Sequence, residues 1–95
     1  MTKADIVSQI SEQTGMEKGD VQITVEAFMR TVRENLESGE NVYLRGFGSF
    51  VVKRRAAKTG RNILAKKSIQ IPAHNIPSFK PSKEFVENVK TKVKV

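Results

Sequence analysis

The 95-residue chain has no cysteine, only one histidine, and no apolar run near the roughly 18 residues that span a membrane. Without cysteine it can form neither disulfides nor thiolate metal sites, and nothing in the composition indicates secretion. Its first residues, MTKADIVSQ, lack the apolar core of a signal peptide. We therefore expect a cytoplasmic protein that does not associate with membranes.

Acidic residues are also missing from a large part of the chain. Residues 41–83 carry ten basic and no acidic side chains, whereas residues 1–40 carry four basic and eight acidic ones. Since His74 is the one histidine and carboxylates are missing around it, no acid–base pair or hard-metal cluster can form beside the basic residues. We expect no enzyme activity, no metal and no cofactor, and we assign His74 to a surface or phosphate-facing position.

The basic residues concentrate in residues 53–67, KRRAAKTGRNILAKK, where seven of fifteen side chains are basic. This stretch has too few large apolar side chains to build a core, and a polyanion is its expected partner. A basic run can also be a solvated face or a flexible tail. Here it lies between two segments with strand character, so the sequence predicts a β-ribbon that is held at its base.

The first part of the chain predicts two amphipathic helices. Thr2 begins a capping-box pattern for a helix over residues 3–14. A second, longer helix begins at Asp20 or at Lys18-Gly19 and ends at Ser38-Gly39. It carries a continuous apolar stripe at helical spacing. The stripe consists of Val21, Val25, Phe28, Met29, Val32 and Leu36. The two helices form a hairpin that needs a further layer to cover it.

The second part predicts a small antiparallel sheet and a last helix. Gly46-Phe47-Gly48 is expected to be a tight turn, and Pro72 and Pro77 fit edges or bends. The basic stretch and the segment after it would form the two antiparallel strands of one ribbon, joined near residues 62–66. Ser82 is the expected N-cap of the last helix. The expected strands cover residues 41–45, 49–53, 68–72 and 78–80.

The chain is small for a stable monomer. A domain of this length buries only roughly 60% of its extended surface, and the ribbon adds little to that. We therefore expect oligomerisation to complete the core. Phe47 and Phe50 could stack on nucleic-acid bases, but we assign them to the core or to a subunit interface.

Two segments carry a family resemblance, GFGSF at residues 46–50 and RAAKTGRN at residues 55–62. With the order of helices around them, they make the chain similar, over essentially its whole length, to the bacterial HU and integration host factor family of histone-like proteins. The resemblance implies an α+β fold in an intertwined dimer. Within one domain it implies a helical base over 1–40, a β-saddle over 41–83 with its arm at about 53–72, and a C-terminal helix and tail over 84–95.

The resemblance also implies a function. It points to an architectural protein that binds duplex DNA with low sequence specificity through minor-groove β-arms, and that bends and compacts DNA in the bacterial nucleoid. Its partners would be double-stranded DNA, especially bent, nicked or junction DNA, and a second copy of the chain, with a heterodimer as the alternative. Two other functions stay open: a sequence-preferring DNA bender like integration host factor, and an RNA- or single-strand-binding module that stacks bases on Phe47 and Tyr43.

At the tip of the arm the chain departs from the family. The family proline, which wedges between base pairs, is replaced by Ile63, and the usual tip glycine is also missing. Isoleucine can serve as a wedge, so we expect Ile63 to insert; the alternative is that it only packs against Leu64. The phenylalanines assigned to the dimer core are Phe28, Phe47, Phe50 and Phe79. The residues expected to contact DNA are Lys3, Arg45, Lys53, Arg54, Arg55, Lys58, Arg61, Asn62, Ile63, Lys66, Lys67, Lys80 and Lys83.

Overall fold

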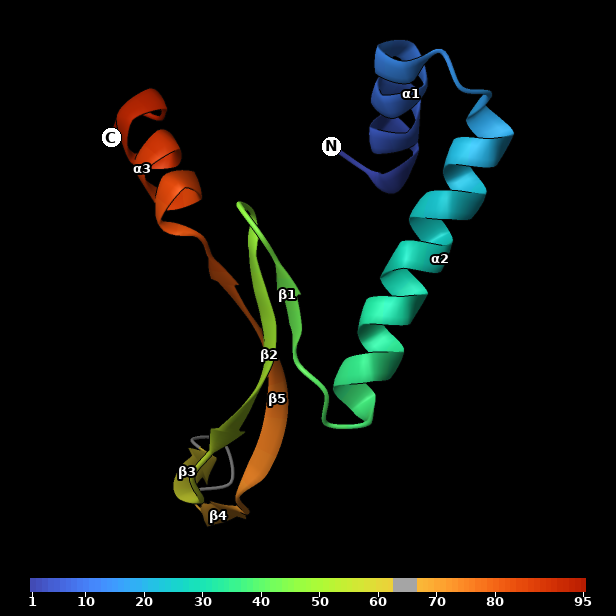
Figure 1. The fold of residues 1–95 in the computed structure, drawn as a ribbon. Coiled ribbons are helices and arrows are strands. Elements are labelled where there is room, and N and C mark those ends of the chain that lie inside the picture. Colours follow the sequence, from blue (N-terminus) through green and yellow to red (C-terminus); the bar gives the residue numbers. More distant parts are fainter. Residues whose placement is uncertain (63–66) are drawn as a thin grey trace. The chain divides into compact units, whose positions relative to one another are not determined.

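The computed structural model describes residues 1–62 and 67–95, which form three helices and five strands in the order α1, α2, β1, β2, β3, β4, β5, α3 (Figure 1). The predicted α+β class is confirmed, with two helices first, an antiparallel sheet next and a helix last. The chain divides into two compact units, residues 1–35 and 36–95, whose boundary falls inside α2. No helix in the described part of the chain is both long and apolar enough to cross a membrane.

In the first unit, α1 (Lys3–Thr14) begins at the predicted capping box. The Thr2 hydroxyl accepts a hydrogen bond from the Asp5 backbone N–H at 3.4 Å, and the Asp5 carboxylate accepts one from the Thr2 N–H at 2.9 Å. Gly15 ends the helix with a φ of 75°, a left-handed conformation that costs glycine little. Local sequence signals therefore set both ends of α1.

The predicted second helix is α2 (Lys18–Glu37), and its apolar stripe is only partly covered within one chain. Val21 and Val32 are buried, at 1% and 9% exposure. Phe28 and Met29 between them are 48% and 52% exposed. The chain's own core does not cover Phe28, so its place in a dimer core stays a prediction.

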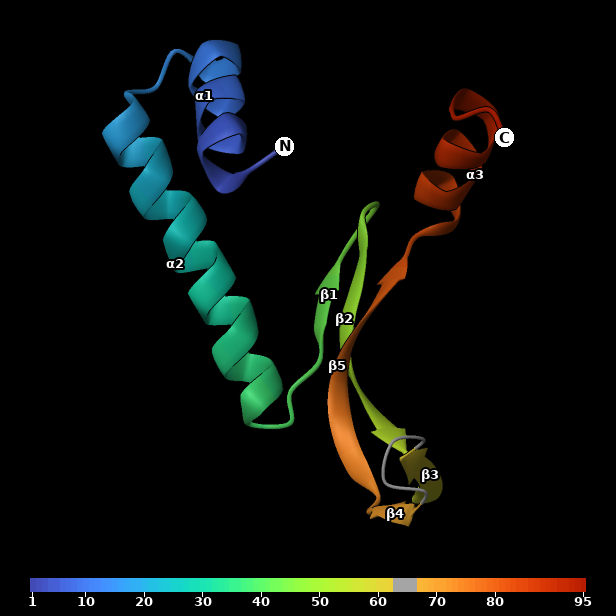
Figure 2. The same ribbon diagram turned by 180° about the vertical axis from the view of Figure 1, so that it is seen from behind.

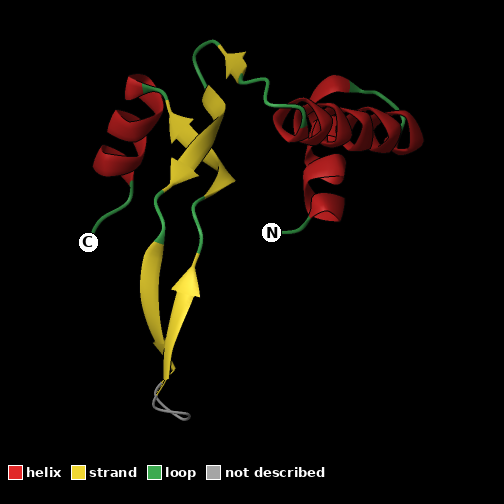
Figure 3. Cartoon of the chain, turned by 90° about the horizontal axis from the view of Figure 1, so that it is seen from below, coloured by secondary structure: helices red, strands yellow, loops and turns green. Residues whose placement is uncertain are grey.

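The second unit contains a three-stranded antiparallel sheet of β1 (Val42–Leu44), β2 (Gly48–Arg55) and β5 (His74–Pro81), in the order β1-β2-β5. Figure 3 shows the strands of this unit in yellow. The prediction of a short third strand over residues 78–80 was wrong, because β5 pairs with β2 along all eight of its residues. Pro77 lies within β5. An edge strand tolerates the missing N–H of proline, as was expected of this residue.

The turn between β1 and β2 spans Arg45–Phe47, and the Phe47 N–H donates to the Leu44 carbonyl at 3.0 Å. Gly48 was expected in this turn but is the first residue of β2. Only glycine fits at position 48, because a Cβ there would lie 2.5 Å from the Lys80 carbonyl oxygen on the neighbouring strand. The second glycine of the GFG motif therefore allows β2 and β5 to approach closely.

Ser82 fixes α3 (Lys83–Lys92) to this turn. Its hydroxyl accepts from the Phe85 N–H at 3.2 Å, which confirms the predicted N-cap, and donates to the Gly46 carbonyl at 3.0 Å. Its backbone N–H donates to the Phe47 carbonyl at 2.9 Å. The start of α3 and the β1–β2 turn are thus held together by the two hydrogen bonds that Ser82 donates to Gly46 and Phe47.

Four phenylalanine rings form an aromatic cluster in this second unit. Phe79 lies at the centre, with ring centroids 4.9 Å from Phe50, 5.2 Å from Phe47 and 6.3 Å from Phe85. Phe47 also stacks on Phe85 at 5.5 Å, yet it remains 46% exposed. The cluster joins three of the four phenylalanines assigned to the dimer core, and the exposed side of Phe47 is free to meet a second chain.

The ribbon consists of β3 (Lys58–Asn62) and β4 (Lys67–Ile71), which pair antiparallel as predicted (Figure 2). Because β2 continues to Arg55, the arm expected over residues 53–72 has two parts: the end of the three-stranded sheet and a separate ribbon. The interruption after β4 falls at Pro72, which has no N–H to donate to a ladder.

Candidate nucleic-acid interface

The end of β2 and the start of β3 present four exposed cations. Lys53 and Arg55 are two residues apart on β2, so they share one face of the strand, while Arg54 points to the other face. Lys58 is the first residue of β3. With no acidic residue between positions 41 and 83, this part of the sequence offers no carboxylate to neutralise them.

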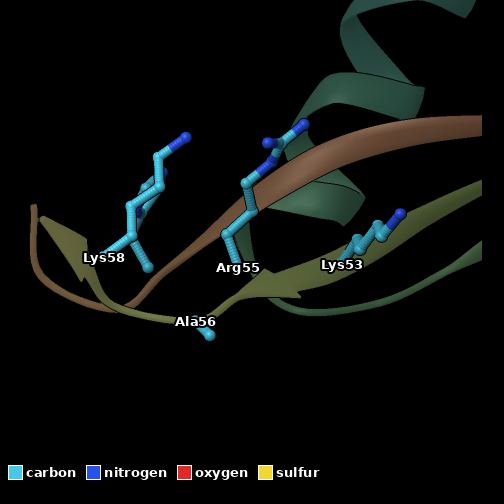
Figure 4. Close-up of a pocket in the computed structure, with 5 residues that line it drawn as sticks. Lys53, Arg55, Ala56 and Lys58 are labelled. Carbon is cyan, nitrogen blue, oxygen red and sulfur yellow. The ribbon is translucent and has the colours of Figure 1, made fainter. Parts of the chain in front are cut away.

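The strand register brings His74 to these cations. His74 pairs directly with Arg55 across β2 and β5, and directly paired residues project from the same face of a sheet. A pocket of about 290 Å³ lies here, lined by Lys53, Arg55, Ala56, Lys58 and His74. The long side chains of Lys53, Arg55 and Lys58 extend to the same side of the chain, and the Ala56 methyl group points the opposite way (Figure 4).

The ring of His74 is held by its own loop. Its Nδ1 lies 2.9 Å from the Pro72 carbonyl oxygen. A carbonyl can only accept a hydrogen bond, so Nδ1 carries the hydrogen, and Nε2 is the ring nitrogen left to face another partner. His74 is exposed, as expected of a surface position. That it faces a phosphate stays a prediction.

The other predicted DNA contacts lie in several places. Arg61 and Asn62 belong to β3 and Lys67 to β4, whereas Ile63 and Lys66 lie outside the described residues. The cations near the opposite end of β5 from His74 are Arg45, Lys80 and Lys83, on the β1–β2 turn, β5 and α3. The structure therefore gathers Lys53, Arg55 and Lys58 at one pocket. The other cations, Arg45, Lys80 and Lys83, lie elsewhere in the same unit.

Lys3, in the first unit, is engaged in an ion pair. Its Nζ lies 2.8 Å from Glu26 Oε2, and both side chains are more than a third exposed. This hydrogen bond, with a second from Gln22, holds the pKa of the Glu26 carboxyl below its usual value. The pair is therefore formed at neutral pH, and it is lost as the pH falls through that lowered pKa.

Two residues of interest were not identified from the sequence. The contact of Phe85 with Phe47 was not expected, because it depends on the Ser82 hydrogen bonds that join α3 to the β1–β2 turn. His74 was not connected to Arg55, because the strand that pairs them was expected to begin only at residue 78. A longer edge strand, tolerant of Pro77, would have revealed this pairing.

A small α+β protein with a cationic two-stranded ribbon belongs to the class that contacts polyanions. The sequence matches the family described as "Bacterial DNA-binding protein" over residues 1–90. DNA-binding protein HU of Thermus thermophilus is 44% identical over 90 residues, which cover 95% of this chain and 93% of that protein. Integration host factor subunit beta of Marinobacter nauticus is 40% identical over 95 residues, covering 99% and 97%.

The structure gives the same result. A chain of an Anabaena HU–DNA cocrystal structure superposes with a TM-score of 0.87 at 32% identity, covering 99% of this chain and all of that one. The chain therefore belongs to the bacterial DNA-binding protein family, with HU and integration host factor subunits among its relatives. This confirms the family expected from the sequence, a family of DNA-binding proteins and not of enzymes.

Proposed function

We propose that this chain is an architectural DNA-binding protein of the nucleoid, which acts as a dimer and bends duplex DNA with little sequence preference. The observation that carries the proposal is the acid-free cationic ribbon, set in a fold that matches an HU–DNA cocrystal chain along 99% of its length. The test is binding to duplexes of unrelated sequence, which should be bound with similar affinity and in preference to structured RNA.

The mechanism follows from charge and groove chemistry. The cations of the ribbon and its base displace counterions from DNA phosphates, which supplies affinity without reading sequence. The minor groove presents a degenerate hydrogen-bond pattern, so a ribbon lying in it distinguishes bases poorly. Bent and junction DNA already contain part of the deformation, and nicked DNA costs less to deform. All three should therefore be preferred over intact straight duplex.

Exposed apolar side chains support the dimer. Phe28 and Met29 are half exposed on α2, and Phe47 is half exposed on the aromatic cluster. Apolar groups of this size are typically covered by a partner. A second copy of the chain would cover these groups by symmetry and would bring two ribbons to one DNA molecule.

The two alternative functions, a sequence-preferring DNA bender and an RNA- or single-strand-binding module, predict different experimental results. Identity of 40% to an integration host factor subunit supports a sequence-preferring bender, which would leave one protected motif in a footprint. Tyr43, 72% exposed on the edge strand β1, could stack a base in an RNA- or single-strand-binding module. Phe47 is a poorer platform, because its ring contacts Phe79 and Phe85.

Releasing Lys3 from its ion pair should strengthen DNA binding. In Glu26→Gln the carboxylate that holds Lys3 is lost, so Lys3 becomes free to meet a phosphate. Glu12→Gln is the matched control, because it changes the net charge equally at an exposed position on α1. We expect Glu26→Gln to bind duplex DNA about twofold to fivefold more tightly than Glu12→Gln, the size of one exposed charge interaction. Equal affinities in a fluorescence titration would show that Lys3 does not contact DNA.

Ile63 is expected to act as the wedge at the kink. It lies outside the described residues, so this prediction rests on the sequence alone. Ile63→Ala should reduce the preference for nicked over linear DNA, because the apolar surface that stabilises unstacked bases is lost. The dependence of affinity on salt should stay almost unchanged, because no charge is removed. An equal loss of affinity for both DNA forms, or no loss, would mean that Ile63 is not the wedge.

A further inference from the structure

We propose that the pocket at the base of the ribbon binds one phosphodiester of the DNA backbone, and that this binding takes up a proton on His74. The inference rests on the proposed DNA-binding function and deepens it. It adds a defined phosphate site and makes the affinity for DNA depend on pH near neutrality.

The lining of the pocket suits a single anion. Lys53 and Arg55 enter from one face of β2 and Lys58 enters from β3, so three permanent positive charges line an open hollow of about 290 Å³. Figure 4 shows these three side chains extending to the same side. Arg55 can donate two parallel N–H bonds to a phosphate, and the lysines add charge without fixing geometry. No carboxylate occurs in residues 41–83 to compete for the cations.

His74 completes the pocket and is its one group that can change charge near neutral pH. Since Nδ1–H is used by the Pro72 carbonyl, Nε2 is the atom that remains for a ligand. In the neutral ring Nε2 is an acceptor, and a phosphate oxygen is also an acceptor, so the two cannot form a hydrogen bond. A proton on Nε2 turns it into a donor and adds a fourth positive charge.

The surroundings couple the proton to the phosphate. On the elements that line the pocket, the charged neighbours of His74 are Lys53, Arg55 and Lys58, and all three oppose a further positive charge. A bound phosphodiester, which stays anionic across this pH range, reverses that balance. DNA binding and protonation of His74 therefore favour each other, and by linkage the affinity for DNA rises as the pH falls.

The sequence makes the experiment selective, because His74 is the only histidine. We would measure the affinity of the full chain for a mixed-sequence DNA duplex by fluorescence anisotropy, in phosphate-free buffers of constant ionic strength between about pH 8 and pH 5.5. The wild type should bind about threefold to tenfold more tightly per ribbon at the lower pH, the size of a shift of up to one unit in one protonation equilibrium.

Three variants give the proposal its controls. His74→Gln keeps a polar side chain that cannot be protonated, and its affinity should not change with pH. His74→Lys, permanently charged, should bind at pH 8 as tightly as the wild type does at low pH. Lys80→Gln removes a cation at the other end of β5 and should weaken binding while keeping the dependence on pH.

The possible outcomes distinguish the pocket proposal from the proposed DNA-binding function. A wild-type affinity that does not change with pH, or a His74→Gln variant with the wild-type pH dependence, would overturn the pocket proposal while DNA binding itself stands. Should His74→Gln fail to fold, the pH curve of the wild type and the behaviour of His74→Lys decide. Absence of DNA binding at every pH would instead overturn the proposed function.

Discussion

Replacing Phe47 with alanine is expected to lower the free energy of unfolding by about 3–5 kcal/mol and to shift the protein from dimer toward monomer. Within one chain the Phe47 ring contacts Phe79 and Phe85, yet 46% of the residue stays exposed. A half-exposed ring cannot cost that much when it is removed. The full loss is therefore expected only if a second copy covers the exposed side of Phe47.

Denaturation at two protein concentrations and sedimentation of the same samples would measure this effect. Tyr43→Ala is the matched control, because this aromatic residue is 72% exposed on the edge strand β1 and makes no ring contact with the cluster. Its replacement should change the stability by about 0.5 kcal/mol or less. A wild type that is folded and monomeric at micromolar concentration would contradict the dimer.

The affinity for DNA should fall steeply with salt. Each phosphate that is neutralised contributes about −0.9 to the slope of log affinity against log salt concentration, so several cations on each of two ribbons should give a slope steeper than about −4. On that rule, raising the salt concentration fourfold lowers the affinity by about two orders of magnitude or more. Lys53, Arg55 and Lys58 are the described cations placed to produce this effect.

Single neutralising variants show which cations take part. Lys58→Gln removes one contact from each ribbon and should make the slope shallower by about one to two units in a dimer. Lys18→Gln, at the first residue of α2, removes the same charge outside the expected DNA contacts and should leave the slope unchanged. A wild-type slope near zero would mean that phosphate contacts do not dominate binding.

The elements with local signals could be predicted from the sequence. The capping box at Thr2, the glycine at position 15 and the N-cap at Ser82 each act through neighbours within a few residues. Their hydrogen bonds form in the structure as the sequence indicated. The strand character of the segments on both sides of the basic stretch likewise predicted a ribbon of two antiparallel segments, which β3 and β4 form.

What the sequence did not reveal depends on pairing between distant segments. The length of β5 follows from its register with β2, and this register alone brings His74 beside Arg55. The need for Gly48 likewise comes from a neighbouring strand, through the carbonyl of Lys80. Phe85 joins the aromatic cluster only because Ser82 holds α3 to the β1–β2 turn. Contacts between residues so far apart in the chain leave no recognisable pattern in a short stretch of sequence.

The central claim is that the cationic ribbon binds and deforms duplex DNA, and a gel-shift series with linear, nicked and four-way-junction DNA over a range of salt tests it most directly. Nicked and junction DNA cost less to bend than intact duplex. We predict that both bind more tightly than linear DNA of the same length and sequence at every salt concentration, while all three affinities fall steeply as salt rises. Equal affinity for the three forms, or the tightest binding to linear DNA, would contradict the account.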